Sequence, residues 1–147
     1  MRRRRWLVAG FIGLALALAA PLVAHAAAVP VRVRIIKGAR AGPLFVDPRL
    51  ADLGPQLTHL VYQHWEQVAE RDVQMDFNKP VSFPLPDGAS LELTLLDARK
   101  DTVSFEVRVP QHRTRSRLTI SKDKRIVHQV SEEKDNEAYF ATIRPWP

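Results

Sequence analysis

The alternation of apolar and polar residues predicts β-strands over most of the chain after residue 28. Val31, Val33 and Ile35 alternate with Arg32 and Arg34, which is the period of a strand that buries one face. The same period returns at 73–77, 81–83, 91–95, 103–109, 118–120, 125–130 and 138–143. We therefore expect a curved, mostly antiparallel sheet of about five to seven strands.

One stretch, residues 47–70, has the period of a helix instead. Asp47 is a residue type that caps helix N-termini, and Pro48 suits the first helical position. Gly54-Pro55 interrupts the pattern, so we expect a short turn at 48–53 and a main helix from Pro55 to about Glu70. The apolar stripe of this helix would consist of Leu53, Leu57, Leu60, Val61, Trp65 and Val68.

The registers of two hairpins can also be predicted, because a slip of one residue would turn the apolar side chains to solvent. Two registers pair apolar with apolar and acid with base: Leu95 opposite Phe105 with Glu92 opposite Arg108, and Phe105 opposite Leu118 with Glu106 opposite Arg117. Together with the helix, these hairpins predict an α+β fold in which one interrupted helix packs on the sheet. A cystatin-like or similar roll is the nearest architecture.

The first 26 residues have the layout of a secretory signal peptide. Four arginines at 2–5 precede an uncharged apolar run from Trp6 to Val23, and Ala24-His25-Ala26 is a small-x-small cleavage signal. The alternative is an N-terminal membrane anchor, because the run is near the lower length for a span. We expect cleavage, which leaves one domain at 27–147, exported to the periplasm or the extracellular space by the Sec or the twin-arginine route.

Removal of the leader changes the charge of the chain. The whole sequence has 22 Lys and Arg against 16 Asp and Glu, and the leader removes four arginines, so the mature domain has a net charge near +2. This value gives no strong indication of nucleic-acid binding. The chain has no cysteine, which excludes disulfides, thiol catalysis and cysteine-ligated zinc.

Basic side chains gather near the third strand of the meander. Arg113, Arg115 and Arg117 occupy alternate positions and should project from one face, close to Lys122 and Lys124. This cluster is a candidate site for an anionic polysaccharide or lipid head groups. The alternative is a solvated outer face, since Arg117 already has an acidic partner in the predicted register.

No catalytic or metal-binding constellation emerges from the remaining residues. His64 falls inside the apolar stripe of the predicted helix, where it would be an acid/base group or, more simply, a structural histidine bonded to backbone or water. No His-x-x-x-His or Gly-x-Ser-x-Gly motif and no glycine-rich phosphate loop is present, so we expect neither an enzyme nor a cofactor. Trp146, in a proline-flanked tail, is a candidate partner contact.

Two short motifs carry a resemblance. Val-Asp-Pro-Arg-Leu at 46–50 and Leu-Pro-Asp-Gly before Leu-x-Leu-x-Leu at 85–95, behind a signal peptide, resemble a group of small exported proteins of myxobacterium-type Gram-negative bacteria. The resemblance implies export and assigns no functional residues. From the sequence we therefore expect an exported module that binds a protein partner, with binding of an anionic glycan or lipid as the alternative.

Overall fold

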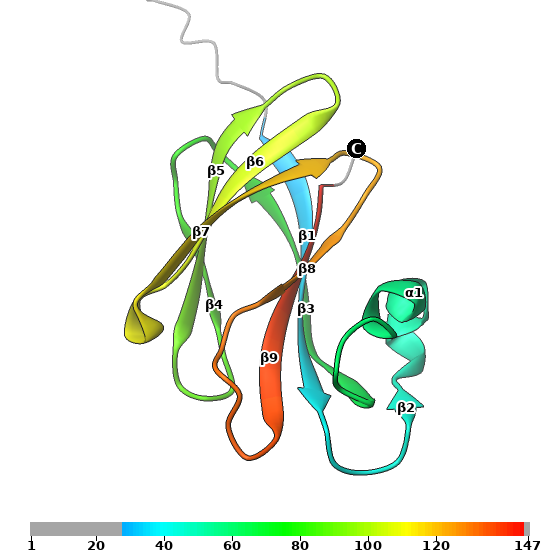
Figure 1. The fold of residues 1–147 in the computed structure, drawn as a ribbon. Coiled ribbons are helices and arrows are strands. Elements are labelled where there is room, and N and C mark those ends of the chain that lie inside the picture. Colours follow the sequence, from blue (N-terminus) through cyan, green and yellow to red (C-terminus); the bar gives the residue numbers. More distant parts are fainter. Residues whose placement is uncertain (1–27, 146–147) are drawn as a thin grey trace, which may run out of the picture.

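The computed structural model describes residues 28–145, which form two sheets and a short helical segment (Figure 1). The strands of the larger sheet, in spatial order, are β2 (Phe45–Val46), β3 (His64–Met75), β1 (Val29–Ala39), β9 (Glu137–Pro145) and β8 (Ile126–Gln129). Those of the smaller sheet are β4 (Val81–Pro84), β5 (Ser90–Ala98), β6 (Thr102–Val109) and β7 (Thr114–Ser121). The helical elements are η1 (Pro48–Leu53), α1 (Gly54–Leu57) and η2 (Pro110–His112). The predicted leader and Trp146 lie outside the described residues.

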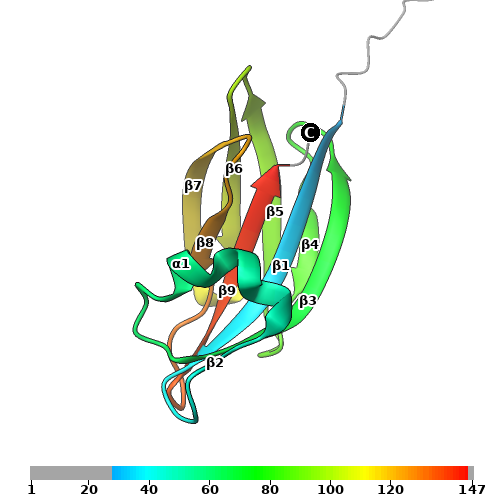
Figure 2. The ribbon, with the colours of Figure 1, turned by 90° about the vertical axis from the view of Figure 1, so that its right-hand side faces the viewer.

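The molecule has three layers. The two sheets face each other, and η1 with α1 covers the outer face of the larger sheet at one end, across β9 and β1 (Figures 1 and 2). The sheets are antiparallel apart from the parallel pairing of β2 with β3. Each layer therefore buries one face of an alternating strand against another, as the period of two requires.

The main core lies between the two sheets. Val31, Val33 and Ile35, the apolar face of the first predicted strand, are each at most 2% exposed there. The opposite side is supplied by the alternating residues of the smaller sheet, Leu91, Leu93, Leu95, Val103, Phe105, Val107 and Val109. Burial of each such side chain contributes about 1.5–3 kcal/mol, so this face carries much of the stability.

A second core lies on the outer face of the larger sheet, beneath η1 and α1. Leu50, Leu53 and Leu57 from the helical segment pack there against Trp65 and Phe140 from the strands. The Trp65 indole N–H donates to the backbone carbonyl of Tyr62 at 3.3 Å, so its polar atom is satisfied where it is buried. This cluster fixes the helical segment to the sheet.

Both predicted hairpin registers are confirmed. Leu95 lies opposite Phe105 and Glu92 opposite Arg108, and in the next hairpin Phe105 lies opposite Leu118. The helix start is confirmed as well. Asp47 caps η1 by accepting from the backbone N–H of Arg49 at 3.0 Å, and a proline occupies the first turn.

The main helix expected from Pro55 to about Glu70 is wrong. The helical segment ends at Leu57, and His64–Met75 is the strand β3, paired along its length with β1. Three of the stripe residues, Leu60, Val61 and Val68, are exposed rather than buried. Pairing with the eleven residues of β1 satisfies the backbone of this segment between strands, and this overrides its local helical period.

The expected fold is confirmed only in coarse form. The chain is mostly sheet with one short helical segment on a sheet face, as predicted. The strands do not form one sheet of five to seven, however, but divide into sheets of five and four. The division arises because β1 pairs with β3 and β9, whereas the strands of the meander β4–β7 pair with one another, apart from an isolated bridge between Leu95 of β5 and Phe77.

Candidate functional site

His64 is a structural residue of the β2–β3 edge. It lies on β3, and its Nε2 is 3.1 Å from Glu66 Oε1 while its Nδ1 is 3.2 Å from the carbonyl oxygen of Pro43. The ring stacks on Phe45 with the centroids 4.9 Å apart. Because both ring nitrogens have local partners, the side chain holds the start of β3 to the preceding loop. The expectation that it lies on a helix stripe is wrong.

The three predicted arginines are not on one face. Arg113 has a φ of 54° and ends η2, whereas Arg115 and Arg117 lie in β7 on the outer face of the smaller sheet, opposite Arg108 and Glu106 respectively. The Arg115 Nε lies 3.6 Å from Glu106 Oε1. The outer face therefore carries two of the three arginines, mixed with acids. Lys122 and Lys124 lie in the exposed turn after β7.

An open pocket of about 630 Å³ lies where three connections meet at one end of the sandwich. The connections are β4–β5, β6–β7 and β8–β9, and the lining residues are Asp87, Gln111, His112, Arg113, Ser131, Glu132, Glu133, Lys134, Asp135, Glu137 and Tyr139. Sequence reasoning missed this pocket, apart from Arg113. The Pro-Asp-Gly turn at 86–88 marks one rim, but nothing in the local pattern indicates that it meets 110–113.

His112 and Asp87 form a pair in the lining of the end pocket. The Nε2 atom of His112 is 3.1 Å from Asp87 Oδ2, and its Nδ1 is buried without a hydrogen-bond partner. Within residues 28–145, no group of three or more His, Cys, Asp or Glu is arranged to hold a metal ion.

The most distinctive surface is the outer edge of β3. β2 runs beside the start of β3 for two residues, pairing Phe45 with His64 and Val46 with Trp65. Beyond that point the chain turns away into η1. Among residues 28–145, no strand pairs with β3 on this side from residue 66 onward.

Two side chains complete the hydrogen bonding of β3 for one further residue. Asp47 accepts from the backbone N–H of Gln67 at 3.1 Å, and the Arg49 guanidinium donates to the carbonyl of Gln67 at 3.3 Å. Asp47 and Arg49 also pair with each other at 2.7 Å. The Arg49 guanidinium, together with the backbone N–H groups of Arg49 and Gln67, holds the pKa of Asp47 well below its usual range. The carboxylate is thereby kept ionised where it replaces a neighbouring strand.

From residue 68 to residue 75 the edge of β3 is open. Val68 stands at a β-bulge, since Ile35 opposes Ala69 and Ile36 opposes Gln67, and its side chain is 46% exposed. Residues 68–72 and 74 are exposed to solvent. In an antiparallel ladder every second residue of an edge strand turns its N–H and C=O away from the neighbour, so this segment presents unpaired backbone groups.

Exposed apolar side chains gather along the same part of the chain. All the large apolar residues that are exposed among residues 28–145 fall between positions 44 and 68: Leu44, Phe45, Leu60, Val61 and Val68. Leu44 is 83% exposed and Phe45 belongs to β2. The open edge is therefore adjoined by apolar surface at the β2 end.

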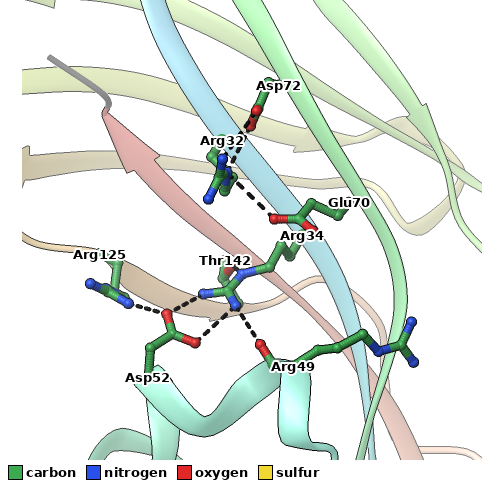
Figure 3. A network of polar contacts seen from close by, with 8 residues as sticks. All are labelled: Arg32, Arg34, Arg49, Asp52, Glu70, Asp72, Arg125 and Thr142. Carbon is green, nitrogen blue, oxygen red and sulfur yellow. Dashed lines mark hydrogen bonds and ion pairs between the residues drawn. The ribbon is translucent and has the colours of Figure 1, made fainter.

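Charged side chains form ion pairs on the outer face of this edge. Arg32 of β1 lies between two carboxylates of β3, with its Nε 2.8 Å from Asp72 and 3.4 Å from Glu70 (Figure 3). The Arg32 guanidinium lowers the pKa of Asp72. The neighbouring Arg34 is buried and pairs with Asp52 of η1 at 2.7 Å. The two carboxylates nearest the open edge thus share one arginine, so the outer face of the edge carries two carboxylates to one guanidinium. Arg71 belongs to the opposite face, where it donates to the carbonyl of Ser82 at 3.2 Å.

Comparisons with known proteins found no match: no family model, no curated protein and no solved structure is similar to this chain. No helix among residues 28–145 has the length and apolar character needed to cross a membrane.

Proposed function

We propose that this protein is an exported, non-enzymatic module that binds a protein partner through the open edge of β3. The observation that carries the proposal is the space beside β3. It is occupied by β2 for two residues and by the Asp47 and Arg49 side chains for one. From residue 68 to residue 75 no strand of the described part of the chain, 28–145, occupies it. An extended segment of a partner would continue the sheet in line with β2.

Two properties of the β3 edge favour the binding of a partner strand over an edge that stays exposed to solvent. The unpaired backbone groups would gain hydrogen bonds along a partner strand, which supplies affinity without a deep pocket. The apolar residues Phe45 and Val68 lie at the start of the open segment, where a partner side chain would cover them. Burial of their exposed surface would contribute about 25 cal/mol per Å².

Export is supported by the leader pattern at 1–26 and by the resemblance of the 46–50 and 85–95 motifs to exported proteins. Cleavage after Ala26 would leave Ala27 as the first residue. Edman or mass-spectrometric analysis of protein recovered outside the cytoplasm tests this. An N-terminus that still contains the arginines at 2–5 in a membrane fraction would favour the anchor instead.

A photo-crosslinking amino acid placed at Gln74, on the exposed edge, tests partner binding directly. We expect a discrete crosslinked species with a protein of the producing cell. Lys100, in the exposed turn between β5 and β6, is the matched control position and should give none. Equal crosslinking from both positions, or none from Gln74, would contradict the proposal.

A second candidate function is the binding of anionic glycan or lipid head groups by the outer face of β7. Arg108 and Arg115 lie directly opposite each other there, with Glu92 3.8 Å from Arg108 and Glu106 3.6 Å from Arg115. A bound anion would add a further partner to this like-charged pair. Retention on an anionic matrix should fall steeply with salt and be lost in Arg115→Glu. Retention that does not change with salt would exclude this candidate.

A further inference from the structure

We propose that the partner strand is β7 of a second copy of this chain, so that the acidic edge of β3 and the basic edge of β7 join copies head to tail. This inference rests on the proposed function, because it names the partner of the same β3 edge. β7 is the other long edge strand: among residues 28–145 it pairs only with β6. The outer faces of the two edges carry side chains of opposite charge, Glu70 and Asp72 on β3 and Arg115 and Arg117 on β7.

The charges lie on corresponding faces of the two strands. Glu70 and Asp72 lie on the outer face of the larger sheet, since they are opposite Arg34 and Arg32, and Arg34 reaches the helical segment on that face (Figure 3). On β7 the outer face of the smaller sheet carries Arg115 and Arg117. In both strands the charged positions are two residues apart, which is the repeat of a strand face.

The backbone groups of the same residues point outward. At the end of β1, the Arg40 N–H donates to the backbone carbonyl of Asn136. Because successive residues of a strand direct their backbone groups to opposite sides, the even-numbered residues of β1 form hydrogen bonds with β9 and the odd-numbered residues form them with β3. The partners of the odd-numbered residues are Ala69, Arg71 and Val73, which leaves residues 70, 72 and 74 turned to the open side.

The same reasoning applies to β7. The Lys122 N–H donates to the carbonyl of Asp101, the residue before β6. By the same alternation, the even-numbered residues of β7 form the hydrogen bonds with β6. Arg115 and Arg117 therefore turn their N–H and C=O groups away from β6. On each edge the residues that carry the charges are also the residues whose backbone groups are available for pairing.

An antiparallel pairing satisfies both requirements in one register. When Glu70 of one copy opposes Arg117 of the next, Asp72 opposes Arg115 two residues further on. The continuous sheet then contains the row Arg34, Glu70, Arg117, Glu106, in which positive and negative charges alternate. In this row Glu70 and Arg117 each lie between two charges of opposite sign. In the second row, Asp72 lies between Arg32 and Arg115, while Arg115 keeps Arg108 as its other neighbour.

Pairing of like edges is unfavourable by comparison. Two β3 edges joined antiparallel about Arg71 would place Glu70 opposite Asp72 of the other copy. Two β7 edges joined in the same way would place Arg115 opposite Arg117, or Arg117 opposite itself. Like charges directly opposite each other destabilise a sheet, so the charges select the mixed pairing.

The interface is heterologous, because it uses two different edges of the chain. Each joined pair keeps one open β3 edge and one open β7 edge, so further copies can add. In this register residues 68–73 of β3 oppose residues 114–119 of β7, so six residues of each strand take part, and the charges at the contact are exposed. We therefore expect concentration-dependent association that weakens as salt screens the charges.

Charge reversal tests the inference. Analytical ultracentrifugation of the purified protein at low salt should show species heavier than the monomer, and their proportion should fall at high salt. Reversal of the acidic edge (Glu70→Lys with Asp72→Lys) or of the basic edge (Arg115→Glu with Arg117→Glu) should weaken association roughly tenfold or more. A 1:1 mixture of the two reversed variants should restore it, because each supplies the complementary edge of the other.

Restoration by mixing is the decisive result, since misfolded variants would not recover. Circular dichroism of each variant confirms that it is folded. A wild-type protein that stays monomeric at every concentration, or a mixture that does not associate, would overturn the inference. Crosslinking from Gln74 to a different protein would leave the proposed function standing, whereas no crosslink at all would remove both.

Discussion

Gly38 of β1 carries no side chain at the point where two aromatic rings cover the strand. A Cβ at position 38 would lie 2.8 Å from Cζ3 of Trp65 and 3.0 Å from Cγ of Tyr62, inside van der Waals contact. Both rings are buried, and they pack edge to face with centroids 5.7 Å apart. The packing of the second core therefore requires a residue without a Cβ atom at position 38.

Replacement of Gly38 by alanine should destabilise the protein. Because neither ring can move without disturbing the packed cluster, we expect a loss of about 1–3 kcal/mol in the free energy of unfolding. Urea denaturation followed by circular dichroism measures it. Gly54→Ala is the matched control: nothing lies within 4 Å of its added Cβ and its φ is −45°, so it should change the stability by less than about 1 kcal/mol. Equal effects of the two substitutions would show that the packing at Gly38 is not tight.

Asp52 connects the helical segment to the sheet. It accepts two hydrogen bonds from the buried Arg34 guanidinium, at 3.0 and 2.7 Å, and it also pairs with Arg125 of the segment before β8 (Figure 3). The Arg34 guanidinium lowers the pKa of Asp52. Loss of this carboxylate would leave a charge that is 8% exposed without its acidic partner.

Asp52→Ala should therefore lower the free energy of unfolding by about 1–3 kcal/mol, because a buried charged donor loses its acceptor. Asp72→Ala provides the comparison, since its pair with Arg32 is exposed to solvent, and it should cost less than about 1 kcal/mol. Thermal unfolding of both variants measures the two losses of stability. A larger loss for Asp72→Ala would contradict the importance assigned to the Arg34 pair.

At the scale of elements, the sequence predicted the meander well and β3 badly. The strands of the meander pair with their neighbours in the chain, so their apolar alternation and their charges specify the register locally. β3 pairs with β1, twenty-five residues or more away, and its face is only partly buried. Its period is also broken by the bulge at Val68. The spacing of Leu57, Trp65 and Val68 imitates a helix because no local signal reveals the partner strand.

The candidate edge could not be predicted for the same reason. Whether a strand is central or lies at an edge depends on the order of strands in the sheet, and that order places β1 between β3 and β9, two strands distant in sequence. The alternate arginines of β7 were visible in the sequence. The matching carboxylates of β3 were visible too, but the helical interpretation hid their common face.

Hydrogen exchange of β3 is predicted to alternate residue by residue. The amides of Arg71 and Val73 bond to β1 and should exchange slowly, whereas those of residues 70, 72 and 74 face the open side and should exchange at rates near those of an unfolded chain. NMR-detected exchange at low protein concentration and high salt resolves these positions. Uniform protection along 69–75 under those conditions would show that the edge is covered.

At the scale of the whole molecule, acid should weaken the fold in two steps. His128 of β8 is half-buried, and burial lowers its pKa below the ordinary value near 6.5. Arginine partners lower the pKa values of the Asp47, Asp52, Asp72 and Glu133 carboxyl groups below their ordinary range near 4. The hydrogen bond to His64, followed by that to Lys37, lowers the pKa of Glu66. In every case the unfolded chain binds protons at a higher pH than the folded one.

The free energy of unfolding should therefore decrease as the pH falls, because the stability that these groups contribute is present above their unfolded pKa values and is lost as the pH falls through their folded ones. The first decrease should begin below about pH 6.5 and depend on His128, and a steeper one should begin below about pH 4. Urea midpoints measured between pH 3 and pH 8 test both. His128→Gln should remove the first step and leave the second, because a glutamine does not titrate while the carboxylates keep their basic partners. A midpoint that rises between pH 6.5 and pH 5 in the wild type but not in His128→Gln would show that His128 gains a proton more readily in the folded protein than in the unfolded chain.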